Sequence, residues 1–219
     1  MRATFQEQLE ELERSLQAQG DLAMRDLRSA LEALGTSDEG LAGEVIRSDA
    51  ESRERFSAIE EMVQVLLARQ APVATDLRLV LSALHVNVAL ERIVAYASTI
   101  AKLTRLVADK PTDQHVQELL ETMGLRTEQM IRVALDSLAA RDADRARSLD
   151  ELDQLVDETN RLVVHTVLEL AEDSEVRAWA LQMLIVARSL ERIGDHAVDI
   201  GEQVIFLVTG ELRALDSSE

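Results

Sequence analysis

Apolar residues recur at spacings of three and four along most of the chain, in long runs that short breaks separate. This spacing places apolar side chains on one face of a helix. The breaks are rich in Gly, Pro, Asp and Ser, and they lie at Gly35–Gly40, Ala71–Pro72, Asp109–Asp113, Arg141–Asp144, Glu172–Ser174 and Thr209–Gly210. At the first break, Thr36 and Glu39 have the spacing of a capping box. The pattern therefore predicts six helices of about 30 residues, each about 45 Å long.

The third and sixth predicted helices match each other when the sequence is shifted by 100 residues. Nine of the twenty residues from 81 to 100 are identical to their counterparts from 181 to 200, and the identities include Glu91 and Arg92 as well as apolar positions. Two amphipathic helices can converge on one core pattern, but the shared Glu-Arg pair favours a duplication. We therefore expect an all-α fold of two three-helix units, residues 1–109 and 110–219.

The composition supports helices and excludes several classes of site. Hydrophobic residues make up 47% of the chain but aromatic residues only 2%, and two Pro and eight Gly leave few turns. The chain has no Cys, which excludes disulfides, thiol nucleophiles and Cys-ligated metals. The formal net charge of -18 disfavours binding to nucleic acid and to anionic lipid. It is compatible with cations or with basic protein partners.

No targeting segment is apparent in the sequence. Residues 1–12 are rich in Glu and Gln and contain no apolar h-region. No run reaches the roughly 18 uninterrupted apolar residues that a transmembrane helix needs. We therefore expect a cytoplasmic protein that meets the membrane only through its partners.

Carboxylates line the side of the sixth predicted helix that lies away from its apolar stripe. At about 100° per residue, these acids lie far from Leu190 and its apolar neighbours, and they are Glu191, Asp195, Asp199 and Glu202. Such a stripe is usually a solvated face, but like charges one turn apart destabilise a helix and a hard cation would remove the repulsion. Asp153 and Asp157, also one turn apart, can face the stripe from the preceding helix. A solvated face and a metal site both stay open on spacing alone.

The identity of the residues in this helix favours the metal site. The segment 191–202, Glu-Arg-Ile-Gly-Asp-His-Ala-Val-Asp-Ile-Gly-Glu, closely resembles the signature helix of the PhoU family. The resemblance covers essentially the whole chain. It implies two three-helix bundles related by a pseudo-twofold axis, with paired acidic motifs that hold iron or zinc clusters, or another divalent cation, on the bundle surface. By resemblance the candidate ligands are Glu191, Asp195, Glu202, Asp153 and Asp157, with Asp199 where the family usually has Asn.

The same resemblance implies a regulatory protein and not an enzyme. Members of the family couple the phosphate ABC transporter to the two-component system that controls phosphate-starvation genes. When phosphate is plentiful, they damp uptake and keep the response off by contacting the transporter ATPase and the sensor histidine kinase. They also form homodimers. Two alternatives stay open from the residues: a metal-dependent hydrolase or oxidase that uses the same carboxylates, and a helical adaptor without metal.

The first half departs from the acidic pattern. Glu91 is followed along its stripe by Ala95 and Lys102, and Asp49 is followed four residues later by Arg53. One carboxylate per helix beside cations is a poor ligand set for several metal ions. We therefore expect metal in the second half only.

The four histidines give an enzyme little support. None follows a Glu by three residues, the spacing of a ferritin-like di-iron site. His196 neighbours Asp195 but lies about 100° around the helix, so we expect it at the surface or bonded between helices. We expect His85 to be partly buried and structural, and Arg192 to pair across helices.

Overall fold

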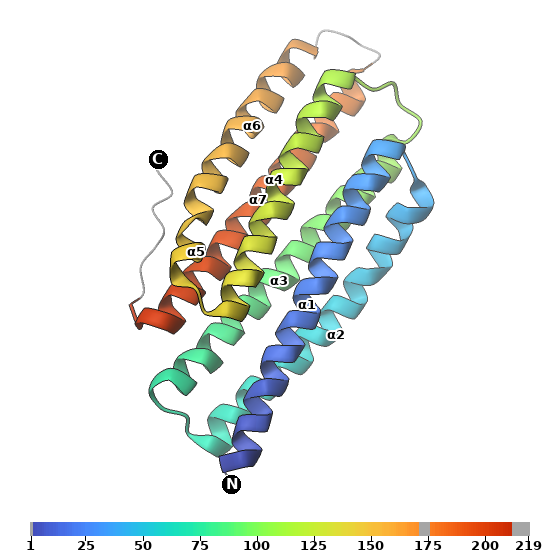
Figure 1. The fold of residues 1–219 in the computed structure, drawn as a ribbon. Helices are drawn as coiled ribbons and strands as arrows, with labels where there is room; N and C mark the ends of the chain where they lie inside the picture. The colour runs from blue at the N-terminus through green and yellow to red at the C-terminus, as the bar shows by residue number, and fades with distance from the viewer. Residues whose placement is uncertain (1, 171–175, 212–219) are drawn as a thin grey trace.

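Six long helices and one short helix make up the described chain. In the computed structural model, which describes residues 2–170 and 176–211, the helices are α1 Arg2–Thr36, α2 Glu39–Gln70, α3 Ala74–Val107, α4 Gln114–Ala140, α5 Ala143–Arg147, α6 Leu149–Leu170 and α7 Arg177–Thr209. Helices α1 to α3 form one up-and-down bundle, and α4, α6 and α7 form the other (Figure 1). The predicted all-α fold of two three-helix bundles is confirmed. The predicted break at Glu172–Ser174 lies outside the described residues.

Aspartates set the starts of several helices. The carboxylate of Asp38 accepts hydrogen bonds from two backbone N–H groups of α2, at 2.8 and 2.9 Å, and Asp113 caps α4 in the same way. The predicted capping box of Thr36 and Glu39 is wrong. Helix α1 continues through Thr36, whose hydroxyl donates to the carbonyl of Glu32 at 2.7 Å, and the N-cap of α2 is Asp38.

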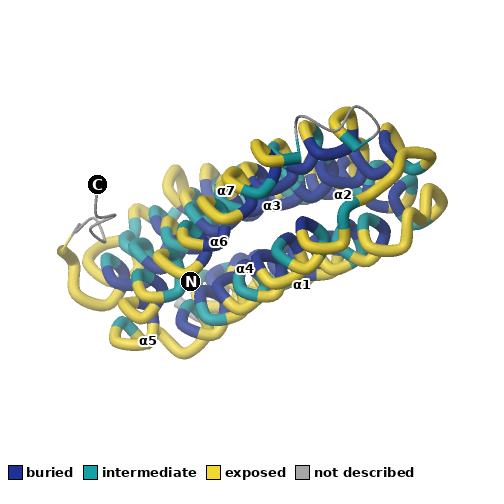
Figure 2. Tube along the Cα trace, turned by 90° about the horizontal axis from the view of Figure 1, so that it is seen from above, coloured by how far each residue is buried: buried dark blue, intermediate teal, exposed yellow. Residues whose placement is uncertain are grey.

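The two bundles share one hydrophobic core. They meet along α3 and α7, with α1 against α4 on the opposite side (Figure 1). Most buried apolar residues of both bundles belong to one continuous cluster, Ala146, Val204 and Ile205 form a small second one, and Figure 2 shows buried positions on all six long helices. Arg78 Nε donates to the carbonyl of Leu207 at 3.1 Å, and Ser82 Oγ to that of Gln203 at 3.3 Å. The halves are therefore joined by apolar packing and by polar contacts.

Two glycines allow α1 and α4 to approach closely at two related points. A Cβ atom at Gly20 would lie 2.7 Å from Leu135 Cδ2, and one at Gly124 would lie 2.7 Å from Leu31 Cδ1. A shift of 104 residues converts Gly20 into Gly124 and Leu31 into Leu135. The contact is thus reciprocal, as a pseudo-twofold axis between the bundles requires.

Helix α3 is the most apolar long helix of the described chain. It alone among the described helices is long and apolar enough to cross a membrane, with a mean hydropathy of 1.4 over its most apolar window. Of that window, 56% is buried inside the molecule. Its packing in the shared core accounts for its apolar character.

Candidate functional site

Four of the six predicted ligands form one electrostatic group on α6 and α7. Burial, together with the nearby carboxylates of Asp157, Asp195, Asp150 and Glu191, raises the pKa of Asp153 to about 6. Burial and then the Glu191 carboxylate raise the pKa of Asp157, against the lowering effect of Arg161. The predicted meeting of the two acidic helices therefore occurs, and it leaves negative charge that nearby arginines compensate only in part.

One of the two glycines of the motif on α7 allows α6 to pack closely. Gly194 and Gly201 are two turns apart. A Cβ atom at Gly194 would lie 3.6 Å from Asp153 Oδ1, and one at Gly201 would lie 2.5 Å from Leu149 Cδ1. An added Cβ at Gly194 would therefore make only an ordinary van der Waals contact with Asp153, whereas one at Gly201 would clash with Leu149. Gly201 is thus the glycine that allows the close approach of α6, and the carboxylates supply the chemistry of the acidic group.

Two carboxylates of α7, those of Glu191 and Asp195, are hydrogen-bonded to side chains of the protein. Arg188 donates to Glu191 Oε1, and Asn160 Nδ2 donates to Glu191 Oε2 at 2.8 Å. Arg192 donates to Asp195 Oδ2 at 2.9 Å. The expectation that Arg192 pairs across helices is therefore wrong, because its partner lies one turn away on α7. The sequence interpretation missed Asn160, although this residue continues the acidic stripe of α6 by one turn.

Asp199 and Glu202 lie one and two turns beyond Asp195 on α7. Asp199 has 58% of its side chain exposed, and its Oδ2 lies 2.9 Å from His196 Nδ1. The His196 ring stacks on Tyr96 of α3, with centroids 5.9 Å apart. Residues 96 and 196 are equivalent in the two repeats, so this stack lies where α3 and α7 cross. His196 thus contacts α3 through ring stacking, but the expected hydrogen bond between helices is wrong, because its partner Asp199 lies on α7.

The donor chemistry of the α6 and α7 carboxylates fits a hard divalent cation. Their oxygens are the ligands such ions prefer. Burial and, after it, the neighbouring carboxylates raise the pKa of Asp153, so a cation there would offset part of this negative charge. Within residues 2–170 and 176–211, no three His, Asp or Glu side chains lie close enough to hold one ion in these side-chain positions. Binding would therefore require Glu191 and Asp195 to turn away from their arginine partners.

The equivalent position on the first bundle carries a cation. Arg53 of α2 pairs with Asp49, and Arg92 lies 3.7 Å from Glu91 on α3. A shift of 104 residues makes Arg53 the counterpart of Asp157, so an arginine replaces a carboxylate at this point. His85 is exposed on the same bundle, and the expectation that it is partly buried is wrong.

The fold and this site together define a class: all-helical proteins built from two related three-helix bundles, with an acidic helix pair on the second. Comparison with known families agrees with that class. The model of the PhoU domain matches the chain twice, over residues 16–104 and 120–204. The chain belongs to the PhoU family.

Relatives and solved structures cover nearly the whole chain. The phosphate-specific transport system accessory protein PhoU homolog of Zymomonas mobilis is 34% identical over 208 residues, which span 94% of this chain and 87% of the relative. The accessory protein PhoU of Escherichia coli is 32% identical, over 94% and 86%. The crystal structure of PhoU from Pseudomonas aeruginosa superposes with a TM-score of 0.91 at 33% identity, covering 94% of this chain and all of that one. The phosphate transport system regulatory protein PhoU from Streptococcus pneumoniae gives 0.89 at 30%, over 95% and 99%.

Proposed function

We propose that this protein is a regulatory accessory protein of high-affinity phosphate transport and has no catalytic activity of its own. It negatively regulates phosphate uptake and the phosphate-starvation two-component response through protein contacts. The observation that carries this proposal is the whole-chain relation to accessory proteins of phosphate-specific transport, at 32 to 34% identity. The protein works in the cytoplasm and reaches the membrane only through its partners. Those partners are the transporter ATPase and the sensor histidine kinase.

Deletion of the gene tests this role. We expect the deletion strain to express phosphate-starvation genes in phosphate-rich medium and the intact gene on a plasmid to silence them again. Transcript levels at high and low phosphate give the measurement. Unchanged transcripts in the deletion strain would contradict the proposal. Affinity purification at high phosphate, followed by identification of the ATPase and the kinase, tests the contacts directly.

The α6 and α7 carboxylates bind a divalent cation or an iron or zinc cluster in this proposal. The support is the group of partly compensated acids around Asp153 and the oxygen donors that they offer. The metal content of purified protein should fall in the double variant Glu191→Ala plus Asp195→Ala. The matched control is Asp49→Ala plus Glu91→Ala on the first bundle, which should leave the metal content unchanged. Equal metal content in all three proteins would contradict a site at these carboxylates, and no stoichiometric metal in any of them would favour the metal-free adaptor.

The proposal also includes a homodimer. Apolar side chains of Leu155, Leu162 and Leu168 on α6 are 39%, 56% and 64% exposed, and a dimer contact would cover such residues. Sedimentation equilibrium of the 24.3 kDa chain should give twice that mass. A monomer at micromolar concentration would contradict the dimer and leave the regulatory role untouched.

A further inference from the structure

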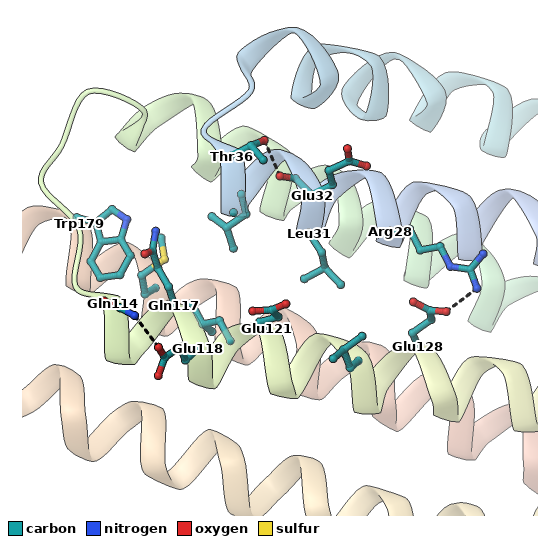
Figure 3. A pocket seen from close by; sticks show the side chains of 15 residues that line it. Arg28, Leu31, Glu32, Thr36, Gln114, Gln117, Glu118, Glu121, Glu128 and Trp179 are labelled. Atoms are coloured by element: carbon teal, nitrogen blue, oxygen red, sulfur yellow. Dashed lines mark hydrogen bonds and ion pairs between the residues drawn. The ribbon is translucent and has the colours of Figure 1, made fainter.

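A groove lies between the bundles near the starts of α4 and α7. It has a volume of about 630 Å³ and runs between the C-terminal part of α1 and the N-terminal part of α4 (Figure 3). Its apolar lining consists of Leu31, Leu34, Leu120, Leu125, Trp179 and Met183. Figure 3 shows Leu31 and Glu121 extending from α1 and α4 into the space between these helices. The groove therefore offers apolar and charged surface to the same occupant.

The groove carries negative charge without matching cations. Glu32, Glu118 and Glu121 line it and are exposed, and across the described residues none of the three forms an ion pair. Arg28 also lines the groove, but its guanidinium is bound to Glu128 at 2.5 Å. An occupant would therefore meet three carboxylates whose charge is available for pairing.

The repeat supplies an internal comparison. A smaller groove of about 420 Å³ lies at the other end of α1 and α4, and Leu79 and Ala83 line it. A shift of 100 residues makes these the counterparts of Trp179 and Met183. In the smaller groove Glu13 is paired with Arg141 at 2.9 Å. Of these two grooves in the described chain, the larger one alone combines a floor of Trp179 and Met183 with several available carboxylates. Its chemistry is therefore not a common feature of the two repeats.

We propose that this larger groove binds a basic amphipathic helix of a partner protein. The lining of α4 from Gln114 to Glu128 extends for about 21 Å at 1.5 Å per residue, which fits a helix of about four turns. The apolar face of that helix packs on Leu31 and Trp179, and its Lys and Arg residues face the glutamates. A second copy of this chain is a poor occupant because its net charge of -18 would oppose the same acids. The inference extends the regulatory role by naming the partner's chemistry.

A synthetic peptide tests the groove in the full-length protein. The probe is a 14-residue amphipathic Leu/Lys helix, with a Leu/Glu peptide of the same pattern as control, and calorimetry gives the affinities. We expect one Leu/Lys peptide to bind per chain and Glu118→Gln plus Glu121→Gln to weaken it by about three- to thirtyfold. Glu44→Gln plus Glu54→Gln on α2 removes the same charge away from the groove and should change the affinity less than twofold. Equal weakening in the two double variants would show general charge attraction and overturn the proposal.

Thiol protection locates the bound peptide. The chain has no Cys, so Leu125→Cys places a single thiol on the groove, where Leu125 is 62% exposed. Leu106→Cys on α3 is the matched control, at 61% exposure outside the groove. The peptide should slow alkylation at position 125 at least fivefold and leave position 106 unchanged. Equal protection, no protection, or protection of position 125 by high protein concentration alone would overturn the proposal. The assay uses no phosphate response, so its failure is distinct from failure of the regulatory role.

Discussion

Asp26 lies in the core of the first bundle, where it is only 2% exposed. Its Oδ1 accepts from Arg25 Nε at 3.2 Å, but its buried Oδ2 has no hydrogen-bond partner among the described residues. A shift of 104 residues makes Met130 its counterpart, and likewise relates buried Gln19 to Met123. The first bundle therefore keeps polar groups in its core at positions where the second bundle has methionines. Burying such groups costs stability unless they are fully bonded.

The stability of the protein should depend on pH through Asp26. Burial raises the pKa of this carboxyl above its usual value, against the lowering effects of Ser48 and Arg25. The folded state thus binds this proton more tightly than the unfolded state does. The resulting contribution to the free energy of unfolding is present in full below the unfolded pKa and is lost as the pH rises through the folded pKa. Relative to wild type, Asp26→Asn should become progressively more stable as the pH rises above the ordinary Asp pKa of about 4.

Thermal unfolding of both proteins at several pH values measures this difference. A packing cost of the Asn side chain does not depend on pH, so the slope of the difference isolates the carboxyl. Asp21→Asn, at an exposed position of the same helix, controls for the change in net charge. A flat slope for Asp26→Asn, or one that favours wild type at higher pH, would contradict the prediction.

The contact between α1 and α4 should be sensitive to the size of residue 20. Ala is favoured over Gly within a helix by about 1 kcal/mol, but a Cβ at Gly20 would meet Leu135 at 2.7 Å. Such overpacking costs about 1–3 kcal/mol. Gly35 lies on the same helix with no atom within 4 Å of an added Cβ. Urea unfolding should show Gly20→Ala to be less stable than wild type and Gly35→Ala to be more stable by up to about 1 kcal/mol. A stabilising Gly20→Ala would show that Leu135 moves aside freely.

The helices follow from the sequence more directly than their contacts do. Apolar spacing predicts the helices because each needs one continuous buried face. The sequence pattern predicts the first break at the correct place but puts the cap at Thr36 instead of Asp38, because several polar residues there can accept the same hydrogen bonds. The acidic stripe predicts that α6 and α7 meet, because i, i+4 spacing fixes a face. The spacing does not show that Arg188 and Asn160 hold Glu191, since side-chain partners depend on the rotation of two packed helices.

At the scale of the whole molecule, the duplication could be predicted and the grooves could not. The 100-residue shift identifies the two bundles, but a groove depends on how far apart α1 and α4 lie at each end. Sequence spacing does not give that separation, which depends on packing contacts between the two helices such as those at Gly20 and Gly124. The predicted boundary between residues 109 and 110 falls between the two matched PhoU segments. The division of the chain into two units at this boundary stays a prediction.

The shared core predicts that the two bundles unfold together. One apolar cluster spans both bundles. If either bundle unfolded alone, the core residues of the other bundle at the contact between α3 and α7 would be exposed to water. Trp179 is the single tryptophan and belongs to the second bundle, so its fluorescence follows that bundle, while circular dichroism follows all helices. The two signals should give the same midpoint in urea. Asp26→Asn, a change in the first bundle, should shift the Trp179 midpoint at neutral pH as much as it shifts the dichroism. If the substitution left the urea midpoint of the Trp179 fluorescence unchanged, the bundles would unfold independently.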